Sequence, residues 1–143
     1  MTAREFLNQY RNADAVVRRY KEVYRTAMLS IDTIRSLSDN DGMPHGSGIS
    51  KPVEDKAIRL IEASESYLIA IETAELIKKQ VLDVINQVPD EPGEVLYQRY
   101  ILLKSWREVA LNVGYSLRRT HDFHKKALRE VEHCIELHTA PVV

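Results

Sequence analysis

The sequence predicts an all-α protein in which a long N-terminal antiparallel helical hairpin precedes a three-helix helix-turn-helix unit. Helix breakers are few, because the 143 residues include only five glycines and five prolines, and three of the glycines lie between Gly42 and Gly48. Apolar residues recur at steps of three and four along two long segments, which is the period of a helix. Two helix-start signals then flank Gly114 in the C-terminal part.

The first segment is expected to be helical from Thr2 until it fades near Ser38. Thr2 and Glu5 have the spacing of a capping box, which satisfies backbone N–H groups at a helix start. Apolar and aromatic residues then follow in alternating steps of four and three, the heptad spacing of coiled-coil packing. A single helix cannot bury such a seam, so a partner helix is expected. The seam consists of Phe6, Tyr10, Ala13, Val17, Tyr20, Tyr24, Ala27, Ile31 and Ile34.

Residues 38–51 are expected to form a loop, because they contain most of the breakers. The Gly46-Ser47-Gly48 run within it lacks the Lys-Ser/Thr ending of a phosphate-binding loop. Pro52 suits the first turn of a second helix, which is expected to end near Gln87. Its seam runs from Val53 to Ile85 in similar steps. Two helices of matching length predict a hairpin over residues 1–88, with oligomerisation as its expected role.

A domain boundary is expected at 88–93, where the sequence reads VPDEPG, with a DNA-binding domain over 93–140. Helical signal resumes at Glu94, and Val95, Leu96, Tyr100 and Leu103 share one face of the first of three helices.

The second and third helices of this unit are marked by their caps. Ser105 and Glu108 have capping-box spacing, and the helix is expected to stop at the Gly114 turn. Ser116 is placed to cap the third helix. This helix continues past Leu128, and its expected inner face is Leu117, Thr120, Phe123 and Ala127. Two short helices joined by a Gly turn are typical of a helix-turn-helix.

The net charge of −1 hides a strong asymmetry. From Arg99 to Arg129 there are eight basic residues and two acidic ones, a net charge of +6, so the rest of the chain carries −7. The acidic part is Val53 to Gln98, with ten acids against four bases. A basic block of this kind favours a polyanion such as double-stranded DNA, because phosphate contacts supply much of the affinity. The alternative is an ordinary solvated helix face.

The stretch LYQRYILLKSWREVALNVGYSLRRTHDFHKKALREV resembles region 4 of the sigma-70 family. The matching residues are Arg99-Tyr100, Ser105, Glu108-Val109-Ala110, Val113-Gly114, Ser116 and Ala127-Leu128. It departs from that pattern at Leu102-Leu103, where Gly or a polar residue is usual, and at Thr120, which replaces an aliphatic residue. The layout with Met43-Pro44-His45-Gly46 also resembles small phage transcriptional regulators of the RinA/ArpU type. That resemblance implies control of phage gene expression, often late genes.

The candidate DNA-binding residues lie mostly on the third helix. Arg118 and Arg119 are the best candidates for bidentate contact with guanine. A phosphate could be held at the start of this helix by Ser116, and further phosphates by Lys104, Lys126 and Arg129. The predicted set is Lys104, Ser116, Arg118, Arg119, His121, Asp122, Lys125, Lys126 and Arg129.

Other chemistries are less well supported by the sequence. His121 and His124 lie one turn apart, but the further His and Cys residues are too far along the same helix to converge on a metal. Trp106 is interpreted as a packing residue. No nucleophile–base pair or metal-ligand set is found, so neither an enzyme nor a cofactor is expected. No membrane span or signal peptide is expected, and the lone Cys134 fits a reducing compartment. The resemblance to phage regulators implies that this compartment is the cytoplasm of a bacterial host cell.

The leading hypothesis is therefore a sequence-specific DNA-binding transcriptional regulator encoded by a phage or prophage. The long heptad seams and the small footprint of one helix-turn-helix favour a homodimer. Two alternatives stay open: a DNA-packaging protein of small-terminase type, and an adaptor that docks on host RNA polymerase.

Overall fold

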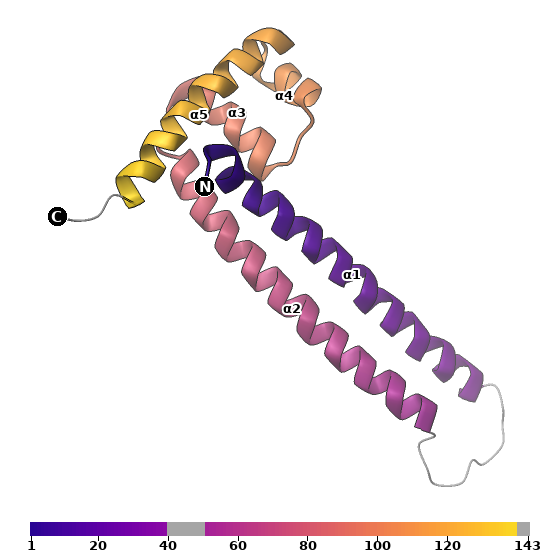
Figure 1. Ribbon diagram of the computed structural model, residues 1–143. Coiled ribbons are helices and arrows are strands. Elements are labelled where there is room, and N and C mark those ends of the chain that lie inside the picture. The colour runs from indigo at the N-terminus through magenta and orange to yellow at the C-terminus, as the bar shows by residue number, and fades with distance from the viewer. Residues whose placement is uncertain (40–50, 140–143) are drawn as a thin grey trace. The chain divides into compact units, whose positions relative to one another are not determined.

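The computed structural model describes residues 1–39 and 51–139, and these residues are helical apart from short connections (Figure 1). The predicted all-α class is confirmed. The expected loop over 38–51 lies mostly outside the described residues. The helices are α1 (Ala3–Asp39), α2 (Lys51–Ile85), α3 (Asp90–Leu96), the π-helical segment η1 (Tyr97–Ile101), α4 (Trp106–Val113) and α5 (Leu117–Thr139).

The chain divides into two compact units. The first joins Met1–Ala13 to Ala74–Val143, and the second is Asp14–Thr73. Both long helices therefore contribute to both units. The helix-turn-helix unit accordingly includes the beginning of α1 and the end of α2, which differs from the expected division at 88–93.

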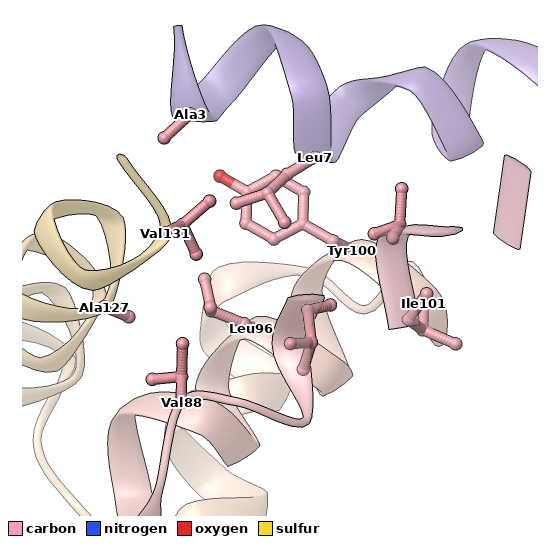
Figure 2. Packing of buried hydrophobic residues seen from close by; sticks show 10 residues of the cluster. Ala3, Leu7, Val88, Leu96, Tyr100, Ile101, Ala127 and Val131 are labelled. Carbon is pink, nitrogen blue, oxygen red and sulfur yellow. The ribbon is translucent and has the colours of Figure 1, made fainter. Parts of the chain in front are cut away.

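The core of the first unit explains this division. Ala3 and Leu7 from α1 lie in one buried cluster with side chains from α2, α3, η1 and α5 (Figure 2). The capping box at the chain start is confirmed, since the Thr2 N–H donates to Glu5 Oε2 (2.9 Å) and the Glu5 N–H donates to Thr2 Oγ1 (3.2 Å). It fixes the first turn of α1 beside the core. The remaining cluster members are Val81, Ile85, Val88, Leu96, Tyr100, Ile101, Ala127 and Val131.

The segment 88–93, expected as an inter-domain boundary, is instead a tight turn in which Val88, Pro92 and Gly93 are buried. Val88 is 5% exposed, and its N–H donates to the Ile85 carbonyl (2.9 Å). Asp90 adopts a left-handed φ of 62°, a conformation that Asp tolerates better than most residues. A side chain on Gly93 would overlap the Val88 carbonyl oxygen. This close approach packs α3 directly onto the end of α2.

The first helix of the helix-turn-helix unit begins and ends earlier than the sequence indicated. It begins at Asp90 rather than Glu94, because Pro92 is tolerated in a first turn, where no intrahelical N–H bond is required. Its last turn, η1, is π-helical, with the Leu102 N–H donating to the Tyr97 carbonyl (3.1 Å). Leu103 therefore lies outside the helix, at a left-handed φ of 56°. The predicted inner positions Val95, Leu96 and Tyr100 are buried as expected.

In the second unit α1 and α2 run side by side and antiparallel (Figure 1), as the hairpin prediction required. The rings of Tyr24 and Tyr67 stack there, with centroids 5.7 Å apart. The predicted seam of α1 is only partly covered: Val17, Tyr24, Ala27 and Ile31 are half-buried and Tyr20 is 40% exposed. Throughout the described residues, no helix is long and apolar enough to cross a membrane.

Candidate nucleic-acid interface

The helix α4 and the turn after it are set by local sequence, as predicted. Ser105 caps α4 by accepting a hydrogen bond at Oγ from the Glu108 N–H (3.2 Å). Gly114 ends the helix with a left-handed φ of 79°, and its N–H donates to the Ala110 carbonyl (3.0 Å). Glycine adopts this conformation without the steric cost that a Cβ brings. The turn directs the chain into α5, while Val109 is fully buried beneath it.

Ser116 caps α5 in the same way. Its Oγ accepts from the Arg119 N–H (3.2 Å), which leaves the hydroxyl hydrogen free to donate to a bound anion. Thr120, the departure from an aliphatic residue, is fully buried and donates its hydroxyl to the Ser116 carbonyl (2.9 Å). The buried hydroxyl is therefore satisfied within the helix.

One face of α5 is exposed and basic. Arg118, Asp122, Lys125 and Arg129 follow one another at steps of four, three and four, and all are exposed, so they form one stripe along the helix. None of the stripe's basic side chains is ion-paired in the parts of the chain that are described, where the one salt bridge joins Arg18 to Asp14. A depression of about 380 Å³ borders the stripe at the start of α5 and is lined by Ser116, Arg118, Arg119, Asp122, Phe123 and Lys126.

Arg119 differs from Arg118 in being supported by aromatic rings. Its guanidinium carbon lies 5.1 Å from the ring centroid of Tyr115 and 5.7 Å from that of Phe123. The two rings meet edge to face, with centroids 5.0 Å apart. Cation–π contact of this kind orients the guanidinium and leaves its N–H edge available to an acceptor. This aromatic support was not predicted from the sequence. Its signal is the four-residue spacing of Tyr115, Arg119 and Phe123, which brings the three side chains to one side of the helix start.

The inner face of α5 differs from the prediction at two positions. His124, which was not among the expected inner positions, is 5% exposed, and Leu117, expected to face inward, is 50% exposed. The buried positions on α5 are Thr120, His124, Ala127 and Val131. Leu117 is the first residue of the helix, so it lies beyond the reach of the packing against α3 that covers later turns.

His124 belongs to a buried aromatic cluster. A hydrogen bond of 2.7 Å joins its Nε2 to the Tyr100 hydroxyl, and the Trp106 ring packs edge-on against it at 4.6 Å. Burial, together with the nearby charge of Arg4, lowers the pKa of His124 to about 4. Burial also raises the pKa of the Tyr100 hydroxyl. Both groups are neutral at neutral pH, so they hold α5 onto η1 and do not contact a ligand as ions.

Three further residues of the basic block and its neighbourhood lie outside the depression: His121, Lys104 and Arg99. His121 packs against Trp106, with centroids 4.5 Å apart, so it is half-buried at the edge of the basic face. Lys104 lies in the connection between η1 and α4, away from the depression. Arg99 stacks on Trp106 at 4.8 Å and donates to the Lys104 carbonyl (2.9 Å). Arg99 is therefore structural, and Trp106 is the packing residue that was predicted.

The structure thus brings five predicted residues to one depression: Ser116, Arg118, Arg119, Asp122 and Lys126. Lys125 and Arg129 share the exposed face of the same helix. Within the described segments, no three His, Cys, Asp or Glu side chains gather as a metal site would require. Comparison of the chain with models of known protein families, with curated proteins and with solved structures finds no match.

Proposed function

We propose that this protein is a sequence-specific DNA-binding transcriptional regulator, encoded by a phage or prophage, that inserts α5 into the major groove. The observation that carries the proposal is the exposed basic face of α5 directly after the Gly114 turn. In a helix-turn-helix, the first residues of the second helix contact base edges, and the flanking cations contact phosphates. The sequence resemblance to sigma-70 region 4 and to phage regulators supports the same assignment.

The two arginines at the start of α5 take different roles in this proposal. Arg118 is exposed, bonds to no other described side chain, and is free to fork onto a guanine edge. Arg119 is held on the Tyr115 and Phe123 rings, so its geometry is fixed before DNA arrives. Lys125, Lys126 and Arg129 lie further along the helix and are assigned to phosphates. Asp122 disfavours a phosphate beside it and restricts how the helix can lie in the groove.

The test begins with selection of bound sequences from random duplex DNA at two salt concentrations. Arg118→Ala is expected to weaken binding to the selected duplex by about 1–3 kcal/mol, with a much smaller effect on a scrambled duplex. Lys126→Ala is expected to weaken binding to both duplexes equally. It is also expected to reduce by about 1 the slope of the logarithm of the binding constant against the logarithm of salt concentration. Fluorescence anisotropy measures all of these affinities.

Lys79→Ala is the matched control for the charge effect, because Lys79 is an exposed cation on α2 and does not line the depression at the start of α5. It is expected to leave both affinities unchanged. Equal losses for Lys79→Ala and Lys126→Ala would show that binding follows net charge alone, which contradicts a DNA interface on α5. Failure to enrich any sequence would contradict sequence-specific recognition.

A second candidate function, docking on host RNA polymerase, is favoured by exposed leucines beside this face. Leu111 on α4 is 81% exposed and Leu117 is 50% exposed. Exposed apolar side chains next to a DNA interface suit a protein contact. Leu111→Ser is expected to abolish capture of purified bacterial RNA polymerase while leaving DNA affinity unchanged. Capture that survives this substitution would argue against the leucines as the docking surface.

A further inference from the structure

We infer that Arg4 and Arg11, at the start of α1, bind phosphates of the DNA backbone beside the duplex segment that α5 contacts. The inference rests on the proposed DNA-binding function and extends it to a helix outside the helix-turn-helix. Both arginines belong to the compact unit that contains α4 and α5. The sequence did not predict this role, because both residues lie far from the basic block along the chain.

Leu7 holds the two arginines at the edge of the core. Its side chain is fully buried in the same cluster as Tyr100, and Figure 2 shows it beside the ring of that residue. Leu7 follows Arg4 by three residues and precedes Arg11 by four, spacings that place all three on one side of a helix. The two arginines therefore leave α1 next to η1, about two turns apart.

Arg11 is bonded to η1, yet one of its donors has no partner. Its Nη2 donates to the Arg99 carbonyl (3.4 Å), and its Nε is buried and bonds to no acceptor among the residues that the structure describes. A buried donor without an acceptor is costly, and a guanidinium has five N–H donors to satisfy. Arg11 as a whole is half-buried, so its guanidinium can turn towards an acceptor at the surface. A phosphate oxygen is such an acceptor.

Three cations gather around Tyr100 without an acid. Burial raises the pKa of the Tyr100 hydroxyl, and three nearby charges act against that rise: Arg4, Arg99 and Arg11. Burial lowers the pKa of Arg99, and the charge of Arg11 lowers it further. Over residues 1–39 and 51–139, no carboxylate forms an ion pair with any of the three arginines. Like charges that gather in this way repel one another, and a bound anion relieves the repulsion.

The Trp106 ring connects this cluster to the basic face of α5 and thereby favours DNA as the anion. The Arg99 guanidinium carbon lies 4.8 Å from the Trp106 ring centroid, and the His121 centroid lies 4.5 Å from it. His121 is at the edge of the basic face, so a polyanion lying along α5 meets the arginines of α1 next. A DNA strand carries a phosphate at every nucleotide and can contact both places at once. Arg99 keeps its structural role, holding Arg11 and adding its charge.

The test is the salt dependence of DNA binding by the full chain with both Arg4→Gln and Arg11→Gln. The slope of the logarithm of the binding constant against the logarithm of salt concentration is expected to decrease in magnitude by about 2, one for each lost phosphate contact. The ratio of wild-type to variant affinity should shrink about tenfold between about 50 and 200 mM salt. The selected and scrambled duplexes should be affected equally, because backbone contacts carry no sequence information.

Arg18→Gln with Arg25→Gln is the matched control. It also removes two exposed arginines seven residues apart, at the same heptad position of α1, but both belong to the second unit. The control is expected to keep the wild-type slope. Replacing Arg4 and Arg11 by lysine retains the charges and is expected to retain most of the slope, which separates phosphate binding from a packing role.

Far-UV circular dichroism and thermal unfolding check that each variant is folded. Arg4 is exposed, so Arg4→Gln alone leaves the core intact and is expected to lower the slope by about 1. Ethylation interference locates the contacts: at one flank of the selected sequence, phosphates whose ethylation weakens the wild type should no longer matter for the glutamine double variant.

An unchanged slope in the glutamine double variant, with the wild type still binding DNA, would overturn the inference and leave the proposed function standing. An equal decrease in the Arg18 and Arg25 control would overturn it too, because net charge alone would then explain the effect. Inorganic phosphate that stabilises the wild type but not the double variant, with an unchanged slope, would assign the cluster to a free anion instead. A wild type that binds no duplex contradicts the proposed function and this inference together.

Discussion

At the scale of single residues, the candidate site depends on side chains that occupy unexpected environments. His124 lies on the helix proposed to enter DNA, yet it is buried and bonded to Tyr100. Leu103 lies in a left-handed conformation that a β-carbon disfavours. It was also the position where the sequence departed from the Gly or polar residue usual in the resembling family. His124 holds α5 onto η1, and Leu103 lies where the chain passes from η1 to α4. Both residues lead to tests.

The first test concerns pH. Because the pKa of His124 falls to about 4 on folding, from about 6.5 in the unfolded chain, the unfolded state binds more protons between these values. The contribution of His124 to the free energy of unfolding is therefore fully present above about pH 6.5 and is expected to fall as pH drops towards 4, by up to about 3 kcal/mol. Urea denaturation at a series of pH values measures this dependence.

The His124→Gln variant is expected to lose that part of the pH dependence. His133→Gln is the control, since His133 is exposed on the same helix, and it should behave like the wild type. If the free energy of unfolding of His124→Gln changed between pH 6.5 and 4 by as much as that of the wild type, a buried, neutral histidine would be contradicted.

The second test compares the two adjacent leucines after η1. Leu103→Gly removes a left-handed strain of about 1–2 kcal/mol, whereas Leu102, at a φ of −79°, has none to lose. In either position glycine adds an entropic cost of about 0.5–1 kcal/mol. We therefore expect Leu103→Gly to be about 1 kcal/mol more stable than Leu102→Gly in chemical denaturation. A larger loss at Leu103 would mean that its side-chain packing outweighs the backbone strain.

At the scale of elements, the short turns determine how the helices meet. The Gly114 turn follows from local rules, because a left-handed residue after a capped helix requires glycine or something close to it. The Val88–Gly93 turn depends on the close approach of Gly93, in α3, to the Val88 carbonyl. Gly93 is required because any side chain there would overlap the Val88 carbonyl. The two prolines and one glycine of this segment suggested a flexible boundary, but the segment is a tight turn.

Gly93→Ala is expected to destabilise the protein by about 2–3 kcal/mol or more, because the new Cβ would overlap the Val88 carbonyl. Gly114→Ala provides the comparison: no atom lies within 4 Å of its added Cβ, so the cost is limited to about 1–2 kcal/mol of backbone strain. Thermal and urea denaturation measure both. Equal losses would contradict the steric role assigned to Gly93.

At the scale of the whole molecule, the compact units do not follow the order of the chain. Ala3, Leu7, Val81 and Ile85 complete a core whose other members come from α3, η1, α5 and the turn before α3. The helix-turn-helix unit therefore includes both ends of the long helices. The remainder of these helices, Asp14–Thr73, is left with exposed apolar side chains.

A fragment of residues 90–143 is accordingly expected to be largely unfolded, because it lacks these four core side chains and Val88 as well. A chain in which a flexible linker joins Ala13 directly to Ala74 is expected to fold cooperatively and to retain the DNA affinity of one helix-turn-helix. Circular dichroism during thermal unfolding compares the two proteins. A cooperative transition in the 90–143 fragment would show that the packing of α1 and α2 is dispensable.

The sequence by itself determined the all-α class, the capped start of α1, the capped helix α4, the Gly114 turn and the exposed cations of α5. Each follows from local rules, namely periodicity, capping and the conformational freedom of glycine. The contacts between distant segments decide that Ala3 and Leu7 join the core, that His124 turns inward to Tyr100, and that the tight turn at 88–93 buries Val88 and Gly93. Those outcomes depend on which side chains fill the space between helices distant in the chain, and the three- and four-residue spacing of one helix carries no information about its neighbours.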